Sequence, residues 1–211
     1  MADERILWGI GTSRTVRAHW ALIELNLPYK IEIIRTRTPD TETNVFKSVN
    51  PRQKIPVLQD GSLTIGESAA IVTYLAENYG ADSINLIPDS PKARAKYFEW
   101  MSFICMELDA TSLYVLRRHW SLPDIYGDSP TANKASEEYF ARMITAADKL
   151  KNPKQKYLLE TGFSGVDILM TTTLKWAIDY NQQIPSNFME YMDHMENRPG
   201  YIAALEANQT Q

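Results

Sequence analysis

The chain has 211 residues, of which 44% are hydrophobic, 10% aromatic and 23% charged, so it can bury a core but is too short for several large domains. Its 22 lysines and arginines are outnumbered by 26 aspartates and glutamates, and the net charge of -4 argues against a nucleic-acid partner. No run of about 18 apolar residues occurs, which argues against a membrane span.

The first part of the chain predicts a β-α-β unit. Charged residues precede the apolar run at 6–10, which is too short for a signal peptide and predicts a buried strand. Apolar side chains recur at helical spacing over 14–25, with Ser13 or Thr12 as the N-cap. Residues 29–34 alternate with a period of two and predict a strand reached by a right-handed crossover.

The next segment predicts a short helix, a hairpin and a longer helix. The helix is expected over 43–49, and strands at 55–59 and 62–65 flank an Asp-Gly dipeptide that suits a tight turn. Apolar residues at helical spacing predict the longer helix over 67–79. The order β-α-β-α-β-β-α predicts an α/β domain over residues 1–80.

The pattern changes after Gly80. Proline and polar residues indicate a linker over 81–90, and the rest of the chain, 91–211, predicts an all-helical domain without a convincing strand. The expected helices cover about residues 91–118, 130–150, 165–180, 187–194 and 198–207.

The cysteine content indicates a reducing compartment. Cys105 is the only cysteine, so the chain has no internal disulfide and no Cys/His cluster that would hold zinc. We therefore expect a cytoplasmic protein without a bound metal.

Pro56 is out of place near the start of a strand because proline cannot donate to a sheet. A cis Ile55-Pro56 bond would explain its position and would turn the backbone groups of Ile55 outward, toward an extended, peptide-like ligand. The alternative is a trans proline on an edge strand.

Glu67 and Ser68 open a predicted helix directly after a predicted strand. The unpaired N–H groups and the positive dipole end of the helix favour a bound anion, and Glu67 adds an acceptor for an ammonium group. The pair can therefore hold both charges of an α-amino acid. The alternative is ordinary helix capping.

Ser13 lies where the first predicted strand meets the first helix. Its hydroxyl is either an N-cap or is aimed at a bound nucleophile, and Thr12 and Thr15 remain alternative hydroxyls. No cysteine is near, so any sulfur chemistry at this corner needs a thiol supplied by a ligand.

These segments resemble the cytosolic glutathione transferases over nearly the whole chain. The matching pieces are TSRTVRAHWALIELNLPY, NPRQKIPVL and DGSLTIGESAAIVTYL in residues 1–80, and GFSGVDILMTTTLKW and ENRPGYIAAL in the second half. The resemblance implies a thioredoxin-like first domain. Ser164 and Asp167 have the spacing of a capping box, which is a structural feature.

The resemblance also implies a glutathione site. Glu67 and Ser68 would hold the γ-glutamyl end, the backbone of Ile55 would pair with the cysteinyl unit beside cis-Pro56, and Lys54 would face the glycyl carboxylate. Glutathione is thus the expected co-substrate.

The activating residue resembles that of the serine-type, bacterial-like members. Trp8 stands where the tyrosine type places its hydroxyl, and Ser13 fits the serine type. The cysteine-dependent reductase type and the Ser-Ser-Cys signature of the maleylacetoacetate isomerases do not match Gly11–Arg14.

The implied reaction is transfer of glutathione to small electrophiles, a detoxification chemistry, with Ser13 stabilising the thiolate. Alternatives are a glutathione-dependent disulfide reductase or peroxidase, and a non-catalytic binding module. A homodimer is implied by the family. The expected electrophile pocket uses side chains of the first helix of the second domain, namely Met106, Ala110, Tyr114, Arg117 and Trp120.

Overall fold

The structure is a computed structural model that describes residues 4–80 and 84–209, and it divides into two compact units. Unit 1 comprises Met1–Ile87 and Glu196–Gln211, and unit 2 comprises Pro88–Met195. The first residues of the expected linker, 81–83, lie outside the described residues. The division differs from the expected one because residues 196–211 group with the first unit rather than with the helical domain.

A four-stranded mixed sheet with the order β2-β1-β3-β4 forms the base of unit 1. The strands are β1 (Arg5–Trp8), β2 (Lys30–Glu32), β3 (Val57–Asp60) and β4 (Leu63–Gly66). β1 runs parallel to β2 and antiparallel to β3, with Leu7 opposite Leu58, and β3 forms the expected hairpin with β4. The βαβ start and the hairpin confirm the predicted α/β topology.

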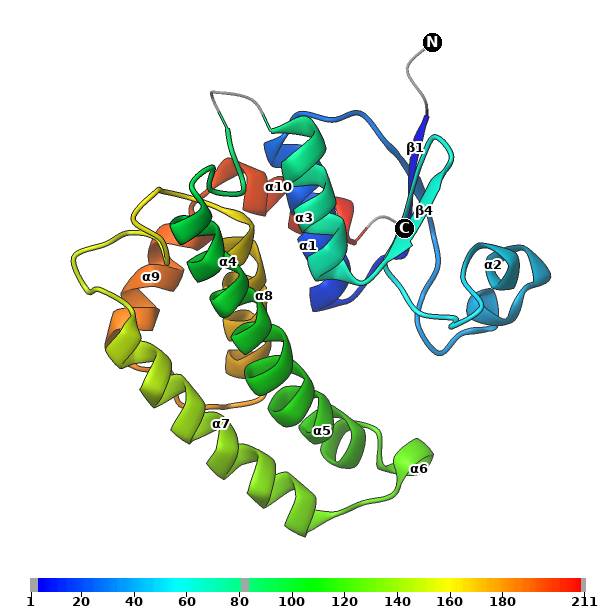
Figure 1. Ribbon diagram of the computed structural model, residues 1–211. Helices are drawn as coiled ribbons and strands as arrows, with labels where there is room; N and C mark the ends of the chain where they lie inside the picture. The colour runs from blue at the N-terminus through cyan, green and yellow to red at the C-terminus, as the bar shows by residue number, and fades with distance from the viewer. Residues whose placement is uncertain (1–3, 81–83, 210–211) are drawn as a thin grey trace. The chain divides into compact units, whose positions relative to one another are not determined.

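Unit 1 also contains helices. They are α1 (Ser13–Glu24), the 3-10 turn η1 (Pro39–Glu42), α2 (Asn44–Val49), α3 (Ser68–Tyr79) and α10 (Pro199–Ala207). Figure 1 shows α10, in red, beside the blue α1, and α1 packs on both α3 and α10.

Aromatic and ionic contacts explain why α10 lies in unit 1. The rings of Trp20 and Tyr201 have centroids 4.8 Å apart, and both side chains are buried. Glu24, at the end of α1, accepts a hydrogen bond from the Trp20 indole at 2.8 Å and pairs with Arg198 at 2.8 Å. The buried aromatic rings and the ion pair together fix α10 on α1.

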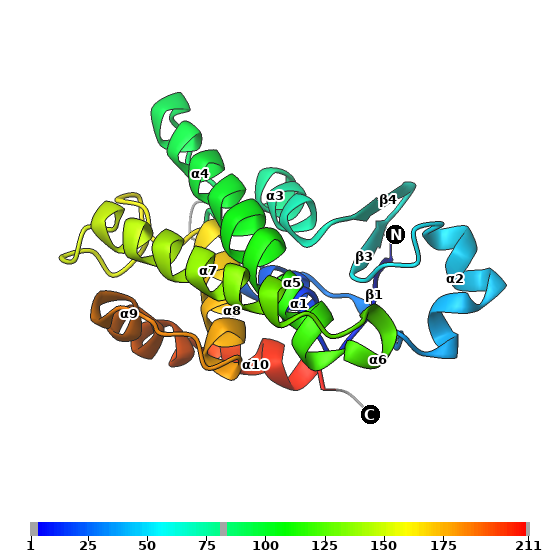
Figure 2. The same ribbon diagram turned by 90° about the horizontal axis from the view of Figure 1, so that it is seen from below.

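Every element of unit 2 within the described ranges is helical, as predicted. The elements are α4 (Pro91–Phe103), η2 (Ile104–Leu113), α5 (Tyr114–Leu116), η3 (Arg117–Ser121), α6 (Pro123–Tyr126), α7 (Pro130–Leu150), α8 (Gly165–Asp179) and α9 (Ser186–Glu196). α8 is buried along most of its length, and α7 runs alongside η2 and α5 (Figure 2).

The first helix of unit 2 differs from the regular α-helix expected over 91–118. It continues to Ser121, and η2 and η3 have the wider turns of a π-helix. In η2 the hydroxyls of Thr111 and Ser112 donate to the carbonyls of Met106 and Glu107, five residues earlier in each case. These side-chain bonds supply partners for carbonyls in the widened turns.

The predicted capping box at the start of α8 is confirmed. The Asp167 carboxylate accepts the Ser164 backbone N–H at 2.9 Å, and its other oxygen accepts the Leu158 N–H at 2.9 Å and the Tyr191 hydroxyl at 3.1 Å. Asp167 thus joins the start of α8 to the preceding loop and to α9.

Candidate functional site

Ser13 is the first residue of α1, and its half-buried hydroxyl makes no hydrogen bond with any residue that the structure describes. The N-cap is Thr12, whose hydroxyl accepts the Thr15 backbone N–H at 3.1 Å, while the Thr15 hydroxyl accepts the Thr12 N–H at 2.9 Å. The two alternative hydroxyls therefore cap the helix, and Ser13 alone of the three keeps its hydroxyl available for a ligand.

The loop between β1 and α1 that carries Ser13 is joined to two other segments of unit 1. The backbone N–H groups of Gly9 and Ile10 donate to Glu32 and Ile34 at 3.0 and 3.1 Å. A Cβ on Gly9, which has a φ of +115°, would lie 2.5 Å from the Cβ of Ile55, so only glycine allows this approach. The close approach brings Ile55 against the loop that leads to Ser13.

The Ile55-Pro56 peptide bond is cis, as predicted. Within residues 4–80 and 84–209, the backbone N–H and C=O of Ile55 have no hydrogen-bond partner, and β3 begins only at Val57. The neighbouring Lys54 is exposed, and its carbonyl accepts the Asn50 amide at 2.8 Å. The backbone of Ile55 can therefore pair with an extended ligand.

Glu67 and Ser68 do not act as ordinary caps of α3. Glu67 is at the N-cap position with a φ of +68°, but its side chain makes no capping hydrogen bond. Its exposed carboxylate pairs instead with Arg52 at 3.1 Å. The buried Ser68 hydroxyl accepts a hydrogen bond from Arg17 Nη1 at 3.2 Å. The first N–H groups of α3 are thus left without a side-chain cap, as an anion site requires.

Arg17 is the site residue whose role the sequence did not reveal. Its guanidinium is only 1% exposed and lies against Ser68 at the N-terminus of α3. A buried arginine beside a helix N-terminus strengthens the attraction for a carboxylate. The available signal was an arginine among the apolar positions of α1, one turn after Ser13, where a surface cation is not expected.

The side chains expected for an electrophile pocket lie along consecutive segments of unit 2. Met106 and Ala110 are on η2, Tyr114 is on α5, and Arg117 and Trp120 are on η3. Met106, Ala110 and Trp120 are exposed, and the other two are half-buried. Their role as a pocket remains a prediction.

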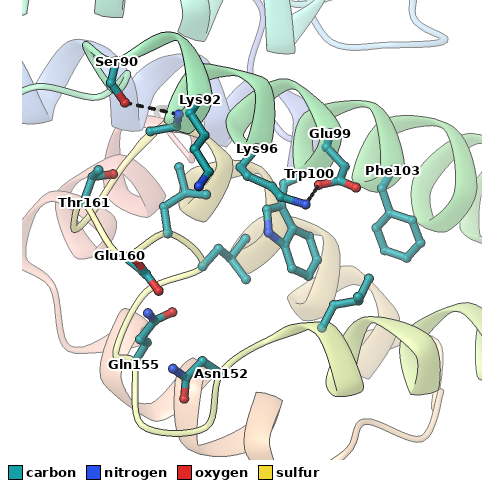
Figure 3. Close-up of a pocket in the computed structure, with 14 residues that line it drawn as sticks. Ser90, Lys92, Lys96, Glu99, Trp100, Phe103, Asn152, Gln155, Glu160 and Thr161 are labelled. Atoms are coloured by element: carbon teal, nitrogen blue, oxygen red, sulfur yellow. Dashed lines mark hydrogen bonds and ion pairs between the residues drawn. The ribbon is translucent and has the colours of Figure 1, made fainter.

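A separate cavity of about 690 Å³ lies within unit 2, between α4 and the segment 150–161. Figure 3 shows Trp100 and Phe103 on its α4 side, with Lys96 paired to Glu99 at 2.6 Å. None of the residues expected at the site lines it, so we do not assign the glutathione site to this cavity.

Within residues 4–80 and 84–209, no helix is long and apolar enough to cross a membrane. In the same ranges, no group of three or more His, Cys, Asp or Glu residues is arranged to hold a metal ion.

The chain is similar to known proteins in sequence and in fold. Residues 13–78 match the family "Glutathione S-transferase, N-terminal domain". Glutathione S-transferase F14 of Arabidopsis thaliana is 34% identical over 108 residues, 48% of this chain but only 41% of the plant protein. Glutathione S-transferase A of Pleuronectes platessa is 24% identical over 205 residues, 96% of this chain and 91% of the fish protein.

A solved structure shows the same fold over both units. The theta class glutathione S-transferase from Xanthomonas axonopodis pv. citri, with glutathione bound, has a TM-score of 0.79 and 22% sequence identity. The match covers 99% of this chain and 99% of that one.

Proposed function

We propose that this chain, which belongs to the glutathione S-transferase family, activates the thiol of glutathione with Ser13 and transfers it to small electrophilic molecules. The observation that carries the proposal is the free hydroxyl of Ser13, because both neighbouring hydroxyls are used for capping. The chain is then a serine-type enzyme.

The two ends of glutathione are recognised by charge. The α-carboxylate of the γ-glutamyl unit binds the N–H groups at the start of α3, with the Ser68 hydroxyl and the buried Arg17 beside it. The ammonium group of the same unit pairs with Glu67, where it competes with Arg52. The glycyl carboxylate faces Lys54.

The middle of glutathione pairs with backbone. The cysteinyl unit is extended, and its N–H and C=O bond to the free C=O and N–H of Ile55, as one strand bonds to another. Ile55 packs against Gly9, so this pairing directs the cysteinyl sulfur to the loop that carries Ser13.

Ser13 lowers the pKa of the bound thiol by donating a hydrogen bond that is stronger to the thiolate than to the thiol. A charge-assisted hydrogen bond contributes about 1.5 to 3 kcal/mol, and about 1.36 kcal/mol moves a pKa by one unit. From a free thiol at about 8.5, this hydrogen bond gives a pKa of roughly 6.5 to 7.5. The N-terminus of α1 acts in the same direction.

The thiolate sulfur then forms a bond to an electrophilic carbon, and the leaving group departs with the electron pair of the broken bond. A cytoplasmic homodimer active in detoxification is the setting that the family suggests for this reaction.

The first experiment is an ultraviolet titration of glutathione bound to the wild type, Ser13→Ala and Ser62→Ala. Ser62 is an exposed serine of the same unit and serves as the matched control. We expect the thiolate pKa to rise by about one to two units in Ser13→Ala, with little change in glutathione affinity, because one charge-assisted hydrogen bond is lost. Ser62→Ala should behave as the wild type.

Two results would contradict the proposal. Glutathione that binds the wild type with an ordinary thiol pKa would favour the non-catalytic binding module. A lowered pKa that is unchanged in Ser13→Ala would move the activating role to another group. Assays with an aryl halide, a peroxide and a mixed disulfide then separate the transferase from the peroxidase and the disulfide reductase.

A further inference from the structure

The end of α10 reaches the loop that carries Ser13. Asn208 follows the last residue of α10 and is 7% exposed. Its backbone carbonyl and its side-chain Oδ1 both accept the N–H of Gly11, each at 3.0 Å. One peptide group of the loop is therefore held by a residue 197 positions later in the chain.

The side chain of Asn208 also contacts Thr12 and Thr15, which lie on either side of Ser13 in the sequence. Its Oδ1 accepts the Thr15 hydroxyl at 2.6 Å, and its Nδ2 donates to the Thr12 carbonyl at 3.4 Å. The Thr15 contact is buried and the Thr12 contact is partly buried. The Asn208 amide thus bonds to Thr12, directly before Ser13, and to Thr15, two positions after Ser13.

We infer that Asn208 is a positioning residue that fixes the direction of the Ser13 hydroxyl, an inference that rests on the proposed function. Gly11 has a φ of +80°, and a Cβ there would meet nothing within 4 Å. Because that Cβ position is open space, the hydrogen bonds to Asn208 are the restraint on this glycine that the described residues show. The loop torsions between Gly11 and Ser13 set the direction of the Ser13 Cα–Cβ bond, from which the hydroxyl reaches the sulfur.

Only the side chain of Asn208 extends this restraint beyond Gly11 to the rest of the loop. Any residue at 208 keeps the carbonyl that accepts the Gly11 N–H, but alanine loses the side-chain bonds to Gly11, Thr12 and Thr15. When the Ser13 hydroxyl samples several directions, it donates a hydrogen bond to the sulfur for a smaller fraction of the time. The thiolate is therefore stabilised less.

The test is the thiolate pKa of glutathione bound to Asn208→Ala in the full-length chain. We expect a rise of about half to one unit, with a lower kcat and an unchanged KM for glutathione, because the hydroxyl acts on the sulfur and not on the ends of the ligand. The double variant Ser13→Ala/Asn208→Ala should have the pKa of Ser13→Ala alone, because Asn208 acts through Ser13.

A matched control separates positioning from simple loss of stability. Arg198→Gln removes the ion pair to Glu24 at the other end of α10, away from the loop. It should lower the thermal midpoint without changing the thiolate pKa. If Asn208→Ala does not fold, Thr15→Val and Thr15→Ser replace it, because serine keeps the hydroxyl while valine loses its bonds to Asn208 and to the Thr12 N–H together.

The outcomes distinguish this inference from the proposed function. A wild-type thiol with an ordinary pKa refutes the function, whatever the variants do. A lowered wild-type pKa that rises in Ser13→Ala but not in Asn208→Ala or Thr15→Val keeps the function and refutes the positioning role. A double variant whose thiolate pKa is higher than that of Ser13→Ala shows that Asn208 acts independently of Ser13.

Discussion

Three hydroxyls within four residues show what the sequence alone could and could not decide. Thr12, Ser13 and Thr15 were all candidates, and only their hydrogen bonds separate the capping pair from the free serine. The cis bond before Pro56 was predictable because proline is poorly suited to a strand. The contacts of Arg17 and Asn208 were not predictable, because they depend on residues distant in the chain.

His19 gives unit 1 a pH dependence. It is completely buried on α1, its Nδ1 lies 2.9 Å from the Tyr29 hydroxyl, and burial lowers its pKa from 6.5 to about 4. Because the unfolded chain binds a proton that the folded chain does not, the contribution of His19 to stability is full above pH 6.5. It is lost as the pH falls toward about 4.

The stability of the variant His19→Gln should therefore fall less than that of the wild type between pH 6.5 and about 4. We expect urea midpoints of the wild type to fall more steeply than those of the variant as the pH drops from 6.5 to about 4. Equal slopes for the wild type and His19→Gln would refute the assignment.

At the scale of elements, periodicity located most helices, while local hydrogen bonding decided their form. The ranges 130–150 and 165–180 match α7 and α8 closely because proline or a capping box marks each start. The wider turns of η2 and η3 had no signal in the apolar pattern. In η2 they are accompanied by hydroxyl-to-carbonyl bonds that depend on the folded backbone.

The start of α8 responds to acid in the opposite direction to His19. Asp167 is fully buried, and burial raises its pKa from 3.8 to about 6, although the hydrogen bonds from Leu158 and Ser164 favour the charged form. The folded chain binds the proton more readily than the unfolded chain. The contribution of Asp167 is thus full below pH 3.8 and is lost as the pH rises through about 6.

We expect Asp167→Asn to remove this pH dependence and to destabilise the chain at all pH values. Asparagine keeps one oxygen and replaces the other with an NH₂ group, so either the Leu158 or the Ser164 N–H loses its acceptor, at a cost of about 1 to 3 kcal/mol. Denaturant unfolding between pH 3.8 and about 6 measures both effects. A variant that keeps the wild-type slope would assign the titration to another group.

At the scale of the whole molecule, the α/β and all-helical classes were predictable, but the path of the last helix was not. The sequence showed a helix over 198–207 and no feature that assigned it to either unit. Its burial of Tyr201 against Trp20 places it in unit 1. That contact joins residues 181 positions apart in the printed sequence, beyond the reach of any local pattern.

Tyr201→Ala should weaken unit 1 selectively. Truncating a buried aromatic ring costs about 3 to 5 kcal/mol, and the Trp20 ring loses its partner. In hydrogen exchange, we expect α1 to lose protection more than α8 does. Phe188→Ala, in the buried face of α9, is the matched control and should show the reverse order. Equal losses in both helices for each variant would show that the units unfold together.

The return of α10 to α1 also orders the events of biosynthesis. A ribosome adds residues from the N-terminus onward, so all of Pro88–Met195 is made before α10 becomes available to the first unit. A nascent chain paused within that stretch has the strands and α1 but lacks Asn208 at the Ser13 loop. The hydroxyl gains this restraint only after the helical unit has been translated, so the part of thiol activation that depends on Asn208 is acquired late in synthesis.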